Sequence, residues 1–319
     1  MTQRLIALLI FLALPAYAAA QAFPSKPIRI IATATVGGGV DASSRIIAQS
    51  LQDLLGQPGV VENRPGSGGA VGGDIVAKSA PDGHTLLAIS ISYAVLPSSH
   101  KNLPFSPERD LVPVAVMVNA PNVLVSHPSL PVKSVKELIA YAKKRPGEIN
   151  YASSGSASPS HLATETLKLL AGIDLTHVPY KGTVPGMTDV IAGRVSLMFA
   201  SIISTRHLAE GGRIRILATA GAKRAAAAPE IPTIAEAGVP GYAVDVWYAL
   251  LAPAATPRPV LERLNQAVAK TLHAPDMTRK LGAMGLEPVA EGVAPTDAYL
   301  KSEIRKWARV VSAAKITAD

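Results

Sequence analysis

Short apolar runs alternate with amphipathic segments along most of the chain. The first four runs are IRIIAT (28–33), GVVENR (59–64), TLLAIS (85–90) and PVAVMV (113–118). Four more follow, INYASS (149–154), LTHVPY (175–180), VSLMFA (195–200) and IRILAT (214–219). Helical patterns such as 41–55 separate them. Strands that alternate with helices predict parallel sheets covered by helices, so we expect two similar α/β units in tandem.

Two further extended runs flank the second unit. They are APNVLVSHP (120–128) and VDVWYALLAPAATP (244–257), and both predict strands that cross between domains. The tail contains two amphipathic helices, 258–272 and 296–313; their apolar stripes are Leu261, Leu264, Val268 and Leu272, then Leu300, Ile304, Trp307 and Val311. A chain that leaves its first domain and later returns to it predicts a hinge and a cleft. We expect domain I at 23–124 plus 247–319 and domain II at 125–246.

The first 22 residues have the pattern of a secretory signal peptide. A basic stretch ends at Arg4, the apolar run LIALLIFLAL follows, and PAYAAAQA offers several A-x-A cleavage sites. The run ends at Pro15, short of the roughly 18 residues that a membrane span needs. Because the chain has no cysteine, a lipid-modified cysteine, a disulfide and a thiolate metal site are excluded. The sequence therefore predicts a free protein in a bacterial periplasm.

The charge balance is basic, with 31 lysines and arginines against 23 acids and a formal net charge of +8. Aromatic residues make up only 4%, and the basic residues are scattered through amphipathic helices instead of clustered. This pattern argues against a nucleic-acid partner. It leaves a surface whose field attracts small anions.

A glycine-rich turn, VGGGVDASSR (36–45), joins the first strand to the first helix. Gly37, Gly39 and Ala42 fit the dinucleotide pattern G-x-G-x-x-A, and Glu62 ends the next strand as a ribose-binding acid would. Export argues against that cofactor, and Asp41 at the expected N-cap would compete with a phosphate. A small carboxylate needs only a few of the free N–H groups at a helix start. A turn capped by Asp41, with no ligand, remains the alternative.

A serine-rich loop begins the second unit in the same way. Its hydroxyls and open backbone come from Ser153, Ser154, Gly155, Ser156 and Ser158. Ordinary turn and cap chemistry would also explain them. Both loops nevertheless follow strands at their carboxyl ends, where open α/β sheets place ligands. We expect two donor-rich helix starts to face each other across the cleft.

Catalysis finds little support. The seven histidines show no HExxH spacing, and G-x-S-x-G is absent. His161 beside the serine loop raises a hydrolase as an alternative, although a structural or ligand-contacting role fits its place at a helix start better. The stretch RPGSGGAVGGDIVAKSAPDGHT (64–85) lacks the Lys-Ser/Thr pair of a P-loop, so its glycines predict a helix packed closely on the sheet. No metal or cofactor is predicted.

Several long motifs converge on one family. They are GGGVDASSRIIAQSLQDLLGQPGVVENRPGSGGAVGGDIVAKSAPDGHTLL (37–87), PNVLVSHPSLPVKSVKELIAYAKKRPGEINYASSGSASPSHLATE (121–165), HVPYKG (177–182) and PEIPTIAEAGVPGY (229–242). In order and spacing they resemble the periplasmic receptors of tripartite tricarboxylate transporters, also called Bug proteins. The resemblance covers essentially the whole chain after the signal peptide. It implies a periplasmic-binding-protein fold of type II, in which a monomer closes on a small carboxylate and delivers it to the membrane subunits of the transporter.

The resemblance also implies which residues bind the ligand. They are Thr35, Val36, Gly37, Gly38, Gly39 and Asp41 in the first loop, Ser90, Ser92 and Tyr93 after the third strand, Ser153, Ser154, Gly155, Ser156, Ala157, Ser158 and His161 in the serine loop, Lys181, Gly182 and Thr183 in the YKG turn, and Ala200.

Three departures from the family pattern bear on the ligand. ATATV (32–36) replaces a proline-containing VPF, Ala157 replaces a glycine, and MFAS (198–201) replaces MFDN. The missing acid at Ala200 weakens the case for an amino acid and favours a plain mono- or dicarboxylate. Tyr93 and Trp247 at expected cleft positions suggest an aromatic one. A sensory receptor that signals to a histidine kinase remains an alternative to the transport receptor.

Overall fold

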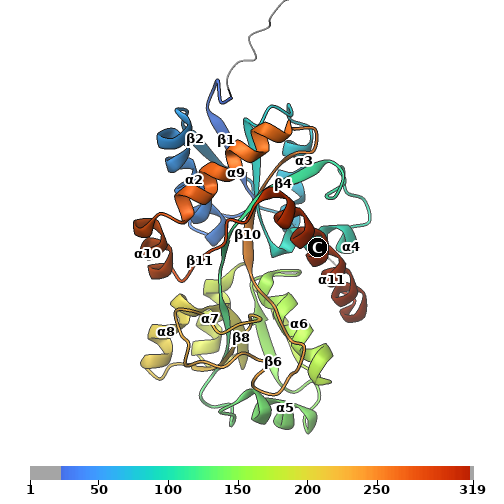
Figure 1. Cartoon of the computed structure of the whole chain (residues 1–319). Coiled ribbons are helices and arrows are strands. Elements are labelled where there is room, and N and C mark those ends of the chain that lie inside the picture. The colour runs from blue at the N-terminus through green and yellow to red at the C-terminus, as the bar shows by residue number, and fades with distance from the viewer. Residues whose placement is uncertain (1–22, 317–319) are drawn as a thin grey trace, which may run out of the picture.

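The computed structural model describes residues 23–316, so the predicted signal peptide lies outside the described residues. Two mixed β-sheets form the centres of an upper and a lower domain (Figure 1). The sequence predicts parallel sheets, but the strands that enter from the crossovers run antiparallel to their neighbours. The two-domain α/β prediction is confirmed, and the strand direction is corrected.

The first sheet has six strands in the order β11-β4-β10-β3-β1-β2. Their bounds are β1 Ile28–Ala32, β2 Gly59–Asn63, β3 Thr85–Ser90, β4 Leu111–Asn119, β10 Trp247–Pro253 and β11 Glu287–Pro288. Strands β1, β2 and β3 are parallel, whereas β10 pairs antiparallel with both β3 and β4. The carboxyl ends of β1 and β3 therefore lie at one edge, where their following loops meet.

The helices of the first domain cover both faces of this sheet. They are α2 Gly39–Leu55, α3 Ala70–Ala77, α4 Leu96–Ser99, α9 Arg258–Leu272, α10 Pro275–Ala283 and α11 Val293–Ala314, with short 3-10 turns η1 at Ser67–Gly69 and η2 at Ile91–Val95. The predicted helix 258–272 is confirmed at both ends. The predicted helix 296–313 is confirmed with one extra turn at its start.

The second sheet has five strands in the order β7-β6-β8-β5-β9. Its strands are β5 Asn122–Ser126, β6 Asn150–Ser153, β7 Thr176–Pro179, β8 Leu197–Ser201 and β9 Arg215–Thr219. Its helices are α5 Val135–Lys143, α6 Pro159–Ala171, α7 Thr183–Ile191 and α8 Ile202–Glu210. Strands β6, β7 and β8 are parallel, so the loops that start α6 and α7 emerge at the same edge.

The chain crosses between the sheets twice, after β4 and before β10. The outward crossing falls between Asn119 and Asn122, and the return lies in the segment 220–246. The predicted domain limit at 124 thus falls inside β5, while the limit at 246 falls directly before β10. The domain limits themselves stay a prediction.

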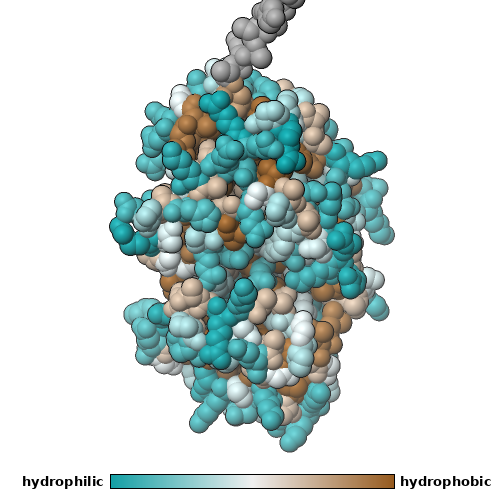
Figure 2. Space-filling view, in the orientation of Figure 1, coloured by the Kyte–Doolittle hydropathy of each residue, from teal (hydrophilic) through white to brown (hydrophobic). Residues whose placement is uncertain are grey.

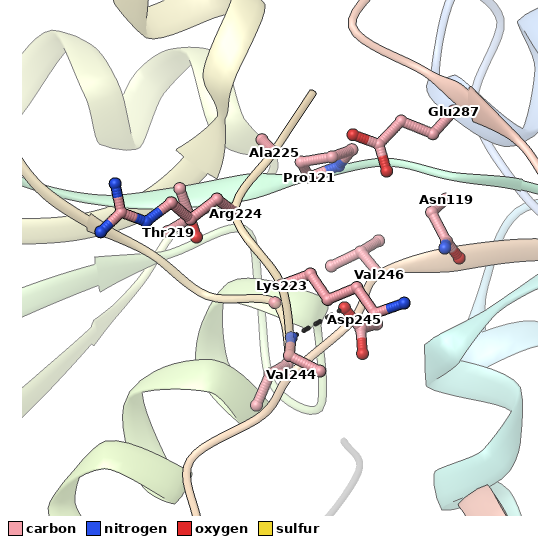
Figure 3. A pocket seen from close by; sticks show the side chains of 12 residues that line it. Asn119, Pro121, Thr219, Lys223, Arg224, Ala225, Val244, Asp245, Val246 and Glu287 are labelled. Carbon is pink, nitrogen blue, oxygen red and sulfur yellow. Dashed lines mark hydrogen bonds between the residues drawn. The ribbon is translucent and has the colours of Figure 1, made fainter. Parts of the chain in front are cut away.

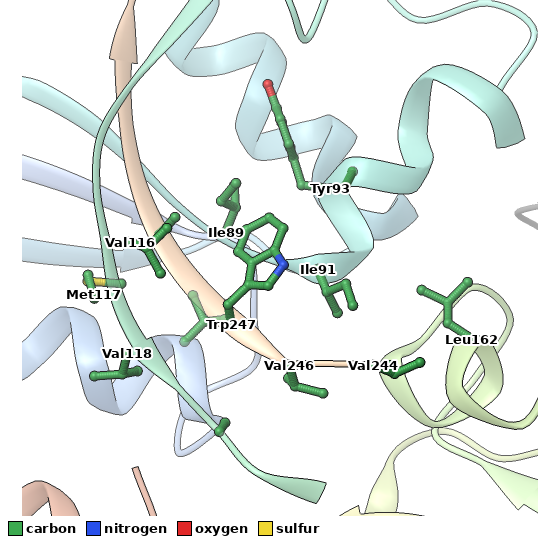
Figure 4. Packing of buried hydrophobic residues seen from close by; sticks show 14 of the residues in the cluster. Ile89, Ile91, Tyr93, Val116, Met117, Val118, Leu162, Val244, Val246 and Trp247 are labelled. Carbon is green, nitrogen blue, oxygen red and sulfur yellow. The ribbon is translucent and has the colours of Figure 1, made fainter. Parts of the chain in front are cut away.

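The larger apolar core is centred on the crossover strand β10. Trp247 is fully buried beside Ile89 and Val116 (Figure 4). Its indole Nε1–H donates to Glu303 of α11 at 3.0 Å, and Trp307 donates to the same carboxylate at 3.0 Å. A buried carboxylate needs such donors, so the tail helix is held to the sheet by both packing and hydrogen bonds.

Two glycines of the 64–85 stretch confirm the predicted close packing of α3. A Cβ on Gly72 would meet Thr33 and Leu87 of the sheet, and a Cβ on Gly73 would meet the ring of Phe105. On the face shown in Figure 2, hydrophilic residues dominate and apolar residues form separate small patches. Within residues 23–316, no helix has the length and apolar character of a membrane span.

Candidate ligand-binding site between the domains

The first loop is held by the carboxylate of Asp41. This side chain, 2% exposed, accepts the N–H of Gly37 at 2.9 Å, Nδ2–H of Asn63 at 2.8 Å and the guanidinium of Arg45 at 2.9 Å. The prediction that Asp41 is the N-cap is wrong: Gly38 is the N-cap of α2, and Asp41 lies in the first turn. The carboxylate thus reaches back to the loop and folds it, as the acid of a capping box does.

The ionisation of Asp41 follows from these contacts. Burial acts to raise the pKa of the carboxyl, but the hydrogen bonds from Arg45, Gly37 and Asn63 outweigh it, so the pKa lies below its ordinary value. Asp41 therefore remains ionised and fully engaged at neutral pH. Its charge is matched by Arg45 and does not repel an anion at the helix start as a lone carboxylate would.

The start of α2 keeps three open donors. Among residues 23–316, no acceptor is recorded for the backbone N–H of Gly39, Val40 or Asp41, because the first intrahelical bond runs from Ala42 to Gly38. These groups carry the positive end of the helix dipole. Such a helix start binds small anions.

A tyrosine lies directly against these donors. A Cβ on Gly39 would collide with the hydroxyl of Tyr248, so glycine is required for the approach of the ring. Burial raises the pKa of Tyr248 to about 12, which keeps its hydroxyl protonated at neutral pH. Within the described residues this hydroxyl has no recorded partner. It is therefore placed to donate to a ligand at the start of α2.

Tyr248 comes from β10 and stands next to the loop after β3. It is directly opposite Ser90 in the β10–β3 pairing, and a register shift follows it in the β10–β4 pairing. Opposed residues present their side chains to the same face, so Ser90 and Tyr248 line one surface. Sequence reasoning missed Tyr248. The alternation of a strand is the signal that would have found it, since Trp247 and Tyr248 must face opposite sides.

Most hydroxyl groups of the serine loop form hydrogen bonds within the loop or with the start of α6. Ser153 is fully buried, Ser154 N–H donates to Ser160 Oγ at 2.9 Å, and Ser158 caps α6 by accepting the N–H of His161. Ser160 is a further member of this network that the sequence prediction left out. The loop is thus rigidly organised, and its backbone and Ser156 are what it presents to the first domain.

A hydrogen bond from Ser92 joins the serine loop to the first domain. Ser92 Oγ donates to the backbone carbonyl of Ala157 at 3.2 Å. A cavity of about 140 Å³ adjoins this contact and is lined by Ser67, Gly68, Ser92, Leu96, Ser99, His100, Ser156 and Ala157. The structure therefore brings the predicted Ser92, Ser156 and Ala157 together between the domains.

The YKG turn offers a second helix start in the second domain. Gly182 is the N-cap of α7 with φ of 115°, and no side chain caps this helix. The N–H groups of Thr183 and Val184 have no recorded acceptor within residues 23–316. Lys181 and Thr183 are exposed. The turn is thus open to a ligand from the carboxyl edge of the second sheet.

Three positions that the sequence analysis placed at the ligand lie away from this surface. They are the aromatic residues Tyr93 and Trp247, and Ala200, where the chain departs from the family pattern. Tyr93 is 1% exposed and donates its hydroxyl to Pro107, Trp247 is in the core described above, and Ala200 is 2% exposed within the smaller apolar cluster. The expectation that Tyr93 and Trp247 mark a cleft for an aromatic ligand is therefore corrected. Both rings fill the core because the strand and the 3-10 turn point them inward.

The dinucleotide and hydrolase alternatives meet structural objections. Both oxygens of Glu62 are engaged, one by Arg29 at 2.7 Å and the other by Arg64 at 2.6 Å, so the acid is not available to a ribose. In the serine loop, Ser153 Oγ lies 2.6 Å from Nε2 of His177, a pair that the sequence analysis, which considered His161, did not predict. Ser153 is fully buried, which keeps its hydroxyl from a substrate.

A second cavity, of about 220 Å³, lies beside the crossover segments (Figure 3). Asp245 accepts the N–H of Ala222 at 3.2 Å, and Glu287 of β11 accepts the N–H of Ala226 at 2.8 Å. Burial raises the pKa of Asp245. These two acids tie the loop after β9 to the hinge and the first domain.

Comparisons with known proteins agree with the geometry. Residues 43–316 match the model of the tripartite tricarboxylate transporter family receptor. Protein BugT of Bordetella pertussis is 37% identical over 316 residues, which are 98% of this chain and 97% of BugT.

Two solved structures were determined with carboxylates. R. palustris Rpa4515 with adipate has a TM-score of 0.82 and 36% identity, covering 92% of this chain and 99% of that one. MatC (Rpa3494) from Rhodopseudomonas palustris with bound malate has a TM-score of 0.78 and 30% identity, covering 91% and 100%. With a family model that covers most of the chain and a relative similar over its whole length, this protein belongs to the tripartite tricarboxylate transporter receptor family.

Proposed function

We propose that this protein is a periplasmic receptor that captures a small aliphatic dicarboxylate between its two domains. The observation that carries the proposal is the start of α2, where three open N–H groups lie beside the Tyr248 hydroxyl and Ser90. Backbone amides, a hydroxyl and a helix dipole together suit a carboxylate without a lysine or arginine partner. The Asp41–Arg45 pair already balances its own charge.

The second domain supplies a matching set of donors. Ser156 and the open N–H groups at the start of α7 would receive the other end of the ligand. Two helix starts, one in each domain, favour a molecule with a carboxylate at each end. Ala200 is buried and carries no charge, so nothing at that position would hold an amino group. The adipate and malate of the two related structures are both dicarboxylates.

Binding needs no chemistry in this scheme. The open form holds the anion on the first domain, and closure adds the contacts of the second domain. A ligand that touches both domains shifts the open and closed populations by its differential affinity. The closed monomer would then deliver the ligand to the membrane subunits of a tripartite transporter, and an N-terminal signal peptide would export the protein to the periplasm.

Titration calorimetry of the mature protein with adipate tests the proposal. Adipamide is the matched control, because it keeps the length and the polar ends of adipate but removes both charges. We expect saturable binding of adipate or malate and none of adipamide or NAD. Equal binding of adipamide, or binding of NAD alone, would overturn the carboxylate assignment.

A further inference from the structure

Both backbone polar groups of Ala157 form hydrogen bonds, and its carbonyl joins the second domain to the first. Its N–H donates to Nδ1 of His161 at 3.1 Å, and its carbonyl accepts the hydroxyl of Ser92 from the first domain at 3.2 Å. The residue is 5% exposed and has φ of 54°, in the left-handed region that alanine rarely adopts. An alanine in this conformation needs its hydrogen bonds to stay there. The imidazole of His161 therefore helps to place the carbonyl that meets the first domain.

The direction of that hydrogen bond fixes the protonation state of His161. A backbone N–H only donates, so Nδ1 must be an unprotonated acceptor and the proton of the neutral ring is on Nε2. Protonation of Nδ1 would place two donors against each other. The N–H of Ala157 would then lose its acceptor in a site where the His161 side chain is 8% exposed and little water can replace it.

The groups around His161 make a stack of rings. His177 of β7 lies parallel at 4.0 Å between ring centroids and contacts Ser153 Oγ through Nε2, while Tyr151 of β6 stacks at 6.3 Å. On its own helix, Glu165 accepts from Tyr151 at 2.6 Å and from Lys168 at 2.9 Å. The residues of β8 (LMFAS) carry no charge.

Helix α11 also packs against α6, and its charged residues include Glu303 and Lys306, which bond to each other. Glu303 is further occupied by the two tryptophans. Glu165 of α6 and Glu303 of α11 thus both have hydrogen-bond partners. The ionisable group stacked directly on His161 is the imidazole of His177. A positive charge on both rings at 4.0 Å would be repulsive.

We propose that His161 is a positioning residue whose neutral imidazole holds Ala157 against Ser92, so that ligand capture weakens when His161 gains a proton in a mildly acidic periplasm. The proposal rests on the carboxylate receptor function above. The order of events follows from the contacts: protonation removes the acceptor, Ala157 leaves its left-handed conformation, and the interdomain contact of its carbonyl is lost.

Adipate binding measured by calorimetry between pH 8 and pH 5.5 tests the proposal in matched variants. His161→Asn keeps an acceptor oxygen near the position of Nδ1 and does not titrate. His161→Leu fills the space without an acceptor. His177→Gln removes the other titrating ring but keeps polar atoms near Nε2. Protonation of adipate itself affects all variants equally and cancels in the comparison.

Relative to His161→Asn, we expect the wild type to lose affinity as the pH falls to 5.5, by up to about tenfold for a fully protonated ring, the scale of one or two hydrogen bonds. His161→Leu should bind weakly at every pH, and His177→Gln should retain the pH dependence of the wild type. The same pH dependence in His161→Asn as in the wild type would overturn the proposal. A dependence abolished by His177→Gln would instead assign the titration to His177 and also overturn it.

A second measurement needs no ligand. In the ligand-free protein, nitrogen NMR should show Nδ1 of His161 unprotonated at pH 8, and the amide of Ala157 should shift with the same midpoint as that ring. If no carboxylate binds, the proposed function fails while this result can still stand. A protonated Nδ1 at pH 8, or an Ala157 amide that ignores the titration, contradicts the positioning role whether or not adipate binds.

Discussion

The loops that start α2 and α6 have the same place in their domains but are stabilised differently. The first is folded by one ionised carboxylate, Asp41, whose acceptor oxygens are directed at the loop and at Arg45. The second is folded by neutral acceptors, chiefly Ser160 Oγ and Nδ1 of His161. The first loop leaves the N–H groups of its helix start open, whereas the second uses most of its polar atoms internally.

This difference suggests a different role in the proposed binding cycle for each domain. Open donors beside Tyr248 make the first domain the surface on which an anion would first bind. The serine loop is already ordered by its own hydrogen bonds, so in the proposed scheme it would present a preformed surface to the ligand on closure. Preorganisation of this kind lowers the entropy lost on closure.

The largest expected effect comes from removing the carboxylate that folds the first loop. Asp41→Ala should lower the free energy of unfolding by about 2–3 kcal/mol, since charge-assisted hydrogen bonds from Gly37, Asn63 and Arg45 are lost together. Because the pKa of Asp41 is lowered in the fold, this stabilisation is complete above the ordinary carboxyl pKa and disappears as the pH falls through the lowered pKa. Urea denaturation at pH 7 and at low pH measures both.

Asp53→Ala is the matched control for Asp41→Ala. Asp53 is an aspartate of the same helix but is exposed, so its replacement should change stability by less than about 0.5 kcal/mol. Equal losses in the two variants would show that Asp41 does not hold the loop.

The next effect separates affinity from stability at two tyrosines. Tyr248→Phe should weaken adipate binding about tenfold and leave the melting temperature nearly unchanged, because the hydroxyl has no recorded partner within the described residues. Tyr93→Phe should do the reverse, since its hydroxyl bonds Pro107 in the core. Calorimetry measures the adipate affinity of both variants, and thermal melts measure their stability. Unchanged affinity in Tyr248→Phe would remove Tyr248 from the site.

A smaller effect tests the strained residue of the serine loop. Ala157→Gly should raise stability by up to about 1 kcal/mol, because glycine adopts φ of 54° without the clash that a Cβ makes. The gain is offset by the greater freedom of glycine in the unfolded chain. A thermal melt measures the net change in stability. A loss of more than about 1 kcal/mol would mean that packing of the methyl group stabilises the fold by more than the backbone strain destabilises it.

The smallest effect contrasts the acid at the hinge with Asp41. Burial, with Glu303 nearby, raises the pKa of Asp245. The fold therefore favours the protonated acid, and stability is lost as the pH rises from the ordinary carboxyl pKa of about 3.9 through the raised value. Asp245→Asn, which can still accept from Ala222, should melt about 2 °C higher than the wild type at pH 7 and equally at pH 3. A lower melting temperature at pH 7 would contradict the sign.

Strand positions were predictable from the sequence. The direction of each strand, and which of its side chains face the core, were not. Apolar runs such as IRIIAT and TLLAIS mark β1 and β3 directly, since burial on both faces selects such runs. The antiparallel course of β10 depends on how the chain returns from the second domain, which no local pattern states. Which of Trp247 and Tyr248 meets the core depends on the partner helix α11, where Glu303 receives the indole.

The sequence predicted which loops form the site better than it predicted the contacts of individual atoms. Motif order pointed to the starts of α2, α6 and α7, and the structure brings Ser92, Ser156 and Ala157 together. It also shows what a sequence does not record: Asp41 folds the loop instead of capping the helix, and His161 lies beneath Ala157 and accepts its N–H. Both depend on side-chain directions within the first helical turn.

The most direct test of the account is a titration of adipate into nitrogen-labelled protein, followed through the amides of Gly39, Val40 and Asp41. These are the open donors on which the proposed site depends. We predict saturable downfield shifts that are largest at these three amides, with no such shifts from adipamide. Saturable binding that leaves them unmoved would place the anion elsewhere and contradict the central claim.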